Sequence, residues 1–388
     1  MKIAVYASMI ASERGHERNV SGHIQVPLES ARRLRLHGHD VHLISNRFGD
    51  DLTLPEMTPR DVALHLVTDS RRRPDAMRGA RGRGGVRPLS FLRQVRELKA
   101  LVRAERFDVV HFFGYPRTGQ LGGLLRRLGM TAPAVFTILG GDLAASGSRW
   151  SFGLLRRFDA IIAGTRYMAD ACRSAGLGAR LIRHGIVRDL AAELGDDSAG
   201  PKHRVLFWRD PSPANGADLA LAAFDEVAPE FPDVSFDFAI RPIYDEVPGL
   251  DDLSARRPNV HVYRFPYEDG ITLPRLIAES LLVVMPFRHL SVNPQFAIAE
   301  SVAAGVPVIA SDLESNPEVV TDGARGVIVP VGQSRPIADA LRRLLSDRDG
   351  LVALGRSAAR DFASQWNWEN YAAALTAVYE EVRGRIRR

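Results

Sequence analysis

The sequence of 388 residues contains a single cysteine, Cys172, so no disulfide can form within the chain. This scarcity fits a reducing compartment, and we expect a cytoplasmic protein. Long apolar runs are also lacking, because a run such as residues 278–287 is too short to span a bilayer. The N-terminal segment lacks the basic region of a secretory signal peptide and continues as a strand-like sequence.

Several catalytic motifs are absent as well. No G-x-G-x-x-G follows the first predicted strand, which argues against a dehydrogenase. The sequence contains no Walker A motif, no H-E-x-x-H and no cluster of cysteine and histidine at metal-binding spacing. We therefore expect neither a resident metal ion nor an organic cofactor.

Acidic residues are fewer than basic ones, which gives a formal net charge of +5 and a pI of about 9.6. Residues 70–88 concentrate this charge, with seven arginines, four glycines and one acid, Asp75. This composition predicts a solvated surface loop, and weak contact with an anionic membrane is a second interpretation that would make the protein membrane-peripheral. Few aromatic side chains accompany the arginines, so nucleic-acid binding is poorly supported.

Short apolar strands alternate with amphipathic helices along nearly the whole sequence. This alternation predicts an α/β fold with parallel, doubly wound sheets, and it restarts after the polar stretch 195–204. We expect two Rossmann-like domains, residues 1–194 and 195–365, that face each other across a cleft. Residues 366–388 are expected to form a closing helix, and the resemblance described below implies that it crosses back to the first domain. Ligands of such sheets bind outside the carboxyl ends of the strands.

Glu300 is an acid in a run of small and apolar residues, which predicts a helix packed on most sides from about Pro294 to Ala304. The first turn of this helix would present free amides to a phosphate. Glu300 lies five residues past Gln295, about 7.5 Å along the axis, where its carboxylate could accept hydrogen bonds from a ribose diol. The alternative is a surface glutamate, but acids are rarely buried without a partner.

Arg209 follows the predicted strand 205–208, at its carboxyl end. An arginine in this position suits a diphosphate through its charge and its planar donor geometry. The alternative is a surface salt bridge, for example to Asp210. Arg209 and Glu300 are expected to face the same cleft.

The sequence contains, in this order, the segments "SGH" with "LHGHDVHLIS", "FDVVHFFG", "FTILGGD", "RHGIV", "FWRDPSPANGADLAL", "SVNPQFAIAESVAAGVPVIAS" and "WNWENYAAAL". "FWRDPSPANGADLAL" is similar to the pattern G-R-x…K-G-x-D-x-L, and "SVNPQFAIAESVAAGVPVIAS" is similar to E-x-F-G-x-x-x-x-E-A-x-A-x-G-x-P-V. This ordered set resembles that of glycosyltransferases with the GT-B fold, specifically the retaining group called family 4, and the resemblance covers nearly the whole chain.

The resemblance implies metal-independent transfer of a sugar, with retention, from a nucleotide-diphosphate donor to a small-molecule or glycan acceptor. It assigns Arg209 to the diphosphate and Glu300 to the ribose, as the residues central to catalysis. Phe265 would lie near the base, and Gly22 would let the backbone approach the phosphates. The remaining donor-side candidates are Asn215, Arg264, Val292, Asn293, Pro294, Gln295, Phe296 and Ala297. The candidates on the acceptor or sugar side are His111, Gly140, Gly141 and Asp142, although a histidine at a strand end more often packs in the core.

The sequence departs from these patterns at the sugar and phosphate ends of the expected donor site. Val292 stands where the first glutamate is expected, with Asn293 next to it as a substitute, and Asn215 replaces the lysine of K-G. Leu139 replaces a histidine and Gln295 replaces a glycine. Two interpretations remain open: an active enzyme with an unusual donor, such as a deoxy or amino sugar, or a homologue of reduced activity that binds a nucleotide sugar or supports a partner enzyme.

Overall fold

The structure is a computed structural model that describes residues 1–13, 22–47, 52–70, 87–141, 143, 149–186, 193, 200–240, 247–268, 270–290 and 292–386. The chain forms two compact units, of which unit 1 is Met1–Val187 with Asn367–Arg388 and unit 2 is Arg188–Trp366. The first division lies seven residues before the predicted boundary after residue 194, and the second lies one residue after the predicted boundary at residue 365. The placement of the units relative to each other is not determined, so each is described by itself, and the predicted cleft between them stays a prediction.

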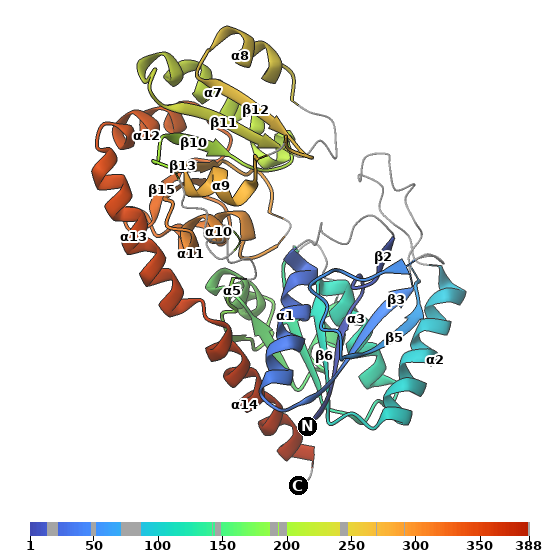
Figure 1. The fold of residues 1–388 in the computed structure, drawn as a ribbon. Coiled ribbons are helices and arrows are strands. Elements are labelled where there is room, and N and C mark those ends of the chain that lie inside the picture. Colours follow the sequence, from blue (N-terminus) through green and yellow to red (C-terminus); the bar gives the residue numbers. More distant parts are fainter. Residues whose placement is uncertain are drawn as a thin grey trace. The chain divides into compact units, whose positions relative to one another are not determined.

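Unit 1 is built on a parallel sheet in the order β5-β3-β1-β6-β7-β8-β9 (Figure 1). Its strands are β1 (Lys2–Ala7), β3 (Asp40–Arg47), β5 (Ala63–Thr68), β6 (Val109–Gly114), β7 (Ala134–Ile138), β8 (Ala160–Ala163) and β9 (Arg180–Leu181). Two further short strands, β2 (Ser12–Glu13) and β4 (Leu52–Thr53), pair antiparallel. The central strands are buried on both faces, as expected for a parallel sheet between helices.

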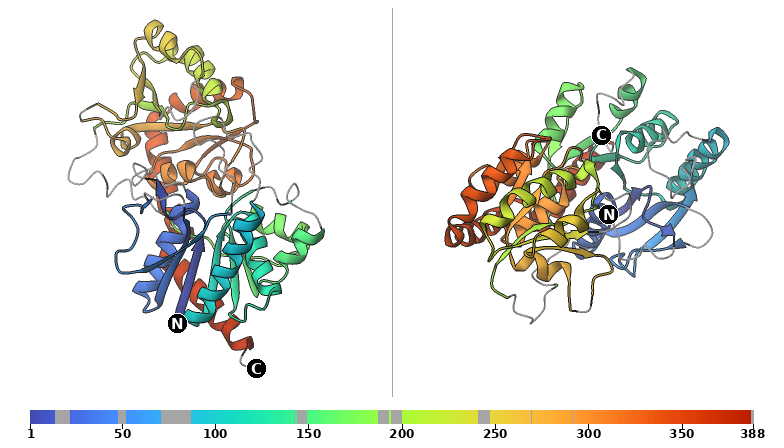
Figure 2. Two further views of the ribbon diagram at one scale, coloured as in Figure 1. Left: turned by 90° about the vertical axis from the view of Figure 1, so that its right-hand side faces the viewer. Right: turned by 90° about the horizontal axis from the view of Figure 1, so that it is seen from above.

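Helices cover both faces of the unit 1 sheet. They are α1 (Gly22–Leu36), α2 (Pro88–Glu105), α3 (Pro116–Arg127), α4 (Arg149–Leu155), α5 (Arg166–Ser174) and α14 (Trp368–Ile386). Helices α2, α3 and α5 share one hydrophobic core with alternate residues of the strands, such as Val110 and Phe112. The last helix, α14, packs beside α1, and Tyr379 Oη of α14 lies 2.6 Å from His111 Nδ1 of β6. The first strand and the last helix belong to one unit. Figure 2 shows the red C-terminal helix beside the blue N-terminal elements.

Unit 2 contains a parallel sheet in the order β12-β11-β10-β13-β14-β15. The strands are β10 (Arg204–Phe207), β11 (Ser235–Ile240), β12 (Val260–Arg264), β13 (Ser280–Met285), β14 (Val308–Ser311) and β15 (Gly326–Val329). The helices are α7 (Ala217–Val227), α8 (Leu250–Arg256), α9 (Leu273–Ala278), α10 (Phe296–Ala303), α11 (Asn316–Val320), α12 (Arg335–Leu345) and α13 (Arg348–Gln365), with short 3₁₀ turns η1 (Pro213–Asn215) and η2 (Ala228–Glu230). Helices α7, α8 and α12 complete the hydrophobic core on one face, together with Leu351 at the start of α13. Helices α9 and α10 contact strands of the sheet outside that core.

The two parallel sheets with helices between their strands confirm the predicted α/β class. Strands β5, β9 and β15 lie at the edges of the sheets. Edge strands are short or partly exposed, so their apolar pattern is weak. Within the described part of the chain, none of the helices combines the length and hydropathy needed to cross a bilayer.

Candidate functional site

The candidate donor site lies at the carboxyl edge of the unit 2 sheet. Strands β10 and β13 are parallel neighbours, so the segments that follow them emerge at the same edge. Arg209 follows β10 by two residues, and the segment after β13 leads into α10. The two central site residues predicted from the sequence therefore belong to adjacent strand–helix connections within one unit.

The predicted helix is present as α10, which begins at Phe296, two residues after the predicted start at Pro294. Its N-cap residue, Gln295, provides no side-chain hydrogen bond to the first turn. Gln295 Oε1 is buried and has no hydrogen-bond partner among the described residues. Glu300 is only 4% exposed, so the expectation of a buried acid in this helix is confirmed. The helix ends before Gly305, whose φ of 75° closes it.

The connection from β10 to α7 is held against the segment after β13. Gly216 has a φ of 76°, and a Cβ built on it would lie 2.1 Å from Pro286 O, so only glycine fits this turn. Arg288 N donates to Ala214 O over 2.9 Å. Asn215, expected in place of a lysine, directs its amide to Asp210 O over 3.0 Å.

The segment before α10 places the predicted sugar-side residues in the interior. Val292 is 4% exposed and apolar. Asn293 Nδ2 donates to Glu314 Oε2 over 2.6 Å, and Asn293 Oδ1 accepts from Ser315 Oγ over 2.6 Å. The amide of Asn293 is therefore used within the loop structure, which argues against the sugar-contacting role considered for it.

Arg264 and Phe265 lie at the carboxyl end of β12, two strands away from β10. Arg264 forms an ion pair with Asp251 over 3.0 Å. Phe265 is 48% exposed, and its ring packs edge to face with Tyr267 at a centroid distance of 5.7 Å. This places an exposed aromatic surface at the carboxyl edge of the same sheet, as a base-stacking residue would require.

His111, predicted on the acceptor side, is fully buried in β6 of unit 1. Its Nδ1 lies 2.6 Å from Tyr379 Oη and its Nε2 lies 2.7 Å from Thr137 Oγ1. Burial lowers the pKa of His111 well below the ordinary value, so the ring is neutral at pH 7. This placement favours the packing role over contact with a sugar.

The other candidates of unit 1 lie near the carboxyl ends of its central strands. Gly22 is the first residue of α1, and Gly140 and Gly141 follow β7. Gly141 has a φ of 90°, and a Cβ on it would approach the ring of Tyr115 at 3.3 Å. Asp142 lies outside the described residues.

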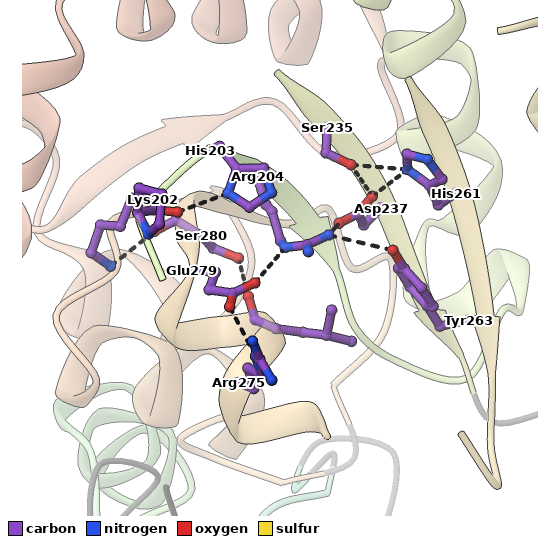
Figure 3. Close-up of polar contacts among 12 residues, drawn as sticks. Lys202, His203, Arg204, Ser235, Asp237, His261, Tyr263, Arg275, Glu279 and Ser280 are labelled. Carbon is purple, nitrogen blue, oxygen red and sulfur yellow. Dashed lines mark hydrogen bonds and ion pairs between the residues drawn. The ribbon is translucent and has the colours of Figure 1, made fainter. Parts of the chain in front are cut away.

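A polar network at the opposite, amino edge of the unit 2 sheet was not predicted (Figure 3). Arg204 donates to Asp237 Oδ2 over 2.6 Å and to Glu279 Oε2 over 3.0 Å. Cavities of about 590 and 360 Å³ border this network and share His203, Arg204 and Tyr263. Asp237 is an acid within an apolar strand sequence, the same signal that drew attention to Glu300.

The charges of this network are matched to one another. Burial alone lowers the pKa of Arg204, but hydrogen bonds to Asp237 and Glu279 outweigh it and raise the pKa. Burial likewise opposes ionisation of Glu279, yet bonds from Arg275 and Arg204 lower its pKa. Among the described residues, no group of three histidine, cysteine or acidic side chains is arranged to hold a metal ion. The network therefore stabilises the amino edge of the unit 2 sheet through paired charges on neighbouring strands.

The chain matches two protein-family models. Residues 20–190 match "Glycosyltransferase Family 4", and residues 202–347 match "Glycosyl transferases group 1". Phosphatidyl-myo-inositol mannosyltransferase from Mycolicibacterium smegmatis is 27% identical over 368 residues, which cover 92% of this chain and 89% of that protein. Spore coat protein SA from Bacillus subtilis is 30% identical over 192 residues, so the match covers 47% of this chain and 50% of that protein.

The fold is shared with solved structures. Anabaena HepE in complex with UDP superimposes with a TM-score of 0.69 and 15% identity, covering 98% of this chain and 100% of that one. At this identity the likeness concerns the fold alone. The two family models, the ordered motifs and the shared fold together identify this chain as a family 4-like glycosyltransferase with the GT-B fold.

Proposed function

We propose that this protein transfers a sugar from a nucleotide-diphosphate donor to an acceptor, with retention at the anomeric carbon and without a metal ion. The observation that carries the proposal is a buried carboxylate in a helix whose N-cap residue, Gln295, makes no side-chain hydrogen bond to the first turn. Glu300 and the first turn of α10 follow β13, and Arg209 follows the neighbouring strand β10.

Each of these groups has a defined task in the proposed reaction. The amides at the start of α10 and the guanidinium of Arg209 stabilise the negative charge that develops on the diphosphate as its bond to the sugar breaks. The carboxylate of Glu300, one to two turns into the helix, accepts hydrogen bonds from the ribose diol. The acceptor oxygen then bonds the anomeric carbon on the face that the diphosphate leaves, and the proton of the acceptor hydroxyl passes to the departing diphosphate.

The donor is proposed to carry UDP or GDP, because a similar structure was solved with UDP and a similar protein from Mycobacterium tuberculosis is a GDP-mannose-dependent mannosyltransferase. The apolar Val292 and the engaged Asn293 leave little polar capacity where a sugar hydroxyl would be bound. This favours a deoxy or otherwise modified sugar. Synthesis of a specialised metabolite or a glycoconjugate would use such a donor.

A thermal-shift screen across nucleotides and nucleotide sugars tests the proposal. UDP or GDP is expected to raise the melting temperature, since a ligand that binds only the folded state stabilises it. Products formed from the donor that raises it most are then examined by NMR for retention, with and without EDTA. Glu300→Ala is expected to abolish transfer.

The same observations on Val292 and Asn293 support a second candidate, a homologue of reduced activity that binds the nucleotide sugar and supports a partner enzyme. This candidate predicts the same thermal shift with no turnover for any acceptor. An inverted product, or turnover that EDTA removes, would instead contradict the retaining, metal-independent reaction.

Contact with an anionic membrane is a further part of the proposal, and it would make this cytoplasmic protein membrane-peripheral. Most of the arginine-rich stretch 70–88 lies outside the described residues. The helix that follows, α2, begins with Leu89 and Leu92 exposed beside Arg93. Vesicles that contain phosphatidylglycerol should sediment the protein at low salt but not at high salt, and deletion of residues 71–86 should weaken this while donor binding survives.

A further inference from the structure

The residues next to Arg209 and Glu300 are joined by a hydrogen bond. Trp208 precedes Arg209 after β10, and Ser301 follows Glu300 within α10. Trp208 Nε1 donates to Ser301 Oγ over 3.0 Å, and Ser301 Oγ donates in turn to Ala297 O over 2.8 Å. This bond connects two residues that lie 93 positions apart in the sequence.

Both partners of this bond are buried, with Trp208 6% exposed and Ser301 fully enclosed. The indole N–H is a donor only, and the serine hydroxyl has a single hydrogen, which it directs to Ala297 O. The hydroxyl oxygen therefore accepts from the indole, and both groups are paired when the helix lies in this position. A shift of α10 would leave a buried donor without an acceptor, which is unfavourable.

The bond also connects helix α10 to the segment that follows β10. Helix α10 contacts β13 and β14, whereas Trp208 extends from β10, the next strand. Trp208 therefore ties the strand that leads to Arg209 to the helix that carries Glu300.

The two residues are also a matched departure from the motifs that the chain resembles. In the pattern G-R-x the residue before the arginine is glycine, and in the pattern E-A-x-A the residue after the glutamate is alanine. Neither glycine nor alanine has a side chain that could form this bond. Trp208 and Ser301 replace both at once and bond each other.

We propose that the Trp208–Ser301 hydrogen bond fixes the spacing between Arg209 and Glu300, so that Trp208 and Ser301 are positioning residues for the nucleotide diphosphate. This inference rests on the proposed function. A ligand held at its ribose by one element and at its diphosphate by another is sensitive to small changes in their separation.

Calorimetric titration of UDP and GDP into the full-length protein tests the inference. Ser301→Ala leaves the buried indole N–H of Trp208 without a hydrogen-bond acceptor and should weaken binding of the nucleotide about tenfold. Trp208→Phe should have a smaller effect, because Ser301 keeps its bond to Ala297 O. The double variant should bind no worse than Ser301→Ala, since the two changes remove one shared interaction.

Ser280→Ala is the matched control. Ser280 is also fully buried in unit 2, and its Oγ donates to the carbonyl four residues earlier, Leu276 O, over 2.7 Å. It lies at the amino edge of the sheet, so Ser280→Ala should change the melting temperature without changing nucleotide affinity.

The outcomes separate this inference from the proposed function. If the wild-type protein binds neither nucleotide, the proposed function fails. If the wild type binds a nucleotide and Ser301→Ala and Trp208→Phe both bind it with wild-type affinity, the positioning inference is overturned while the proposed function stands. The same holds if the fold-losses in affinity of the two single variants multiply in the double variant. Should Ser301→Ala not fold, Trp208→Phe decides, because a full-affinity Trp208→Phe protein contradicts the inference.

Discussion

Asn293 Nδ2 donates to Glu314 Oε2 over 2.6 Å, which ties the segment before α10 to the loop after β14. The other end of the same amide accepts from the buried Ser315 hydroxyl. Because both ends of the amide are engaged, the residue supports the loops around the donor site from within.

We therefore expect Asn293→Ala to lower the free energy of unfolding by about 1–3 kcal/mol, because Ser315 loses its acceptor in the interior. Urea unfolding measures this loss, and the combined Asn293→Ala/Ser315→Ala variant should lose less than the sum of the single changes. A variant that is fully stable but has lost turnover would instead assign Asn293 to the sugar.

The network around Arg204 yields a second prediction. Arg204→Met leaves Asp237 and Glu279 without their shared cation, and Asp237 is fully buried. We expect a loss of about 3–5 kcal/mol in stability. Arg335→Met, which breaks the exposed pair of Arg335 with Asp339, should cost less than about 1 kcal/mol by the same urea measurement. Equal effects in the two variants would show that the network contributes no more than a surface pair.

Two buried histidines predict that unit 1 loses stability in mild acid. Burial lowers the pKa of His184 to about 4, against a partial offset from its bond to Gly185 O, and it lowers the pKa of His111 well below the ordinary value. The unfolded chain binds protons at these residues near pH 6.5, whereas the folded chain does not. Their contribution is therefore complete above pH 6.5 and falls as the pH drops toward 4.

The expected loss from His184 is about 1.5 kcal/mol between pH 6.5 and pH 5, and His111 adds a loss in the same direction. Urea unfolding at a series of pH values measures it. His111→Gln keeps polar atoms near Thr137 and Tyr379 but cannot be protonated. The slope of its free energy of unfolding against pH should therefore be smaller than that of the wild type, by the equivalent of about one proton. The same slope in the variant and the wild type would contradict the assignment.

The sequence predicted the fold and the position of Glu300 because both depend on local patterns. Alternating strands and helices are visible in short windows, and an acid among small apolar residues stands out in the sequence. The engagement of Asn293 was not predictable in this way, since its partners follow 21 and 22 positions later. His111 is similar, because its partner Tyr379 lies 268 residues away on the last helix.

The bond between Trp208 and Ser301 shows the same limit. Each residue is unremarkable alone, a tryptophan after a strand and a serine in a helix. Only the packing of α10 beside the end of β10 brings them together. Candidate site residues that are marked by their charge, such as Arg209 and Glu300, could therefore be proposed from the sequence, whereas contacts between residues far apart in the sequence required the structure.

The central claim is that Glu300 holds the donor nucleotide, and calorimetric titration of UDP and GDP into the wild type and Glu300→Gln tests it most directly. Glutamine keeps the size of the buried side chain and removes its charge. We predict that at least one nucleotide binds the wild type, and that Glu300→Gln weakens its binding by about tenfold or more, since hydrogen bonds to a charged group contribute about 1.5–3 kcal/mol. Equal affinity of the folded variant and the wild type would contradict the account.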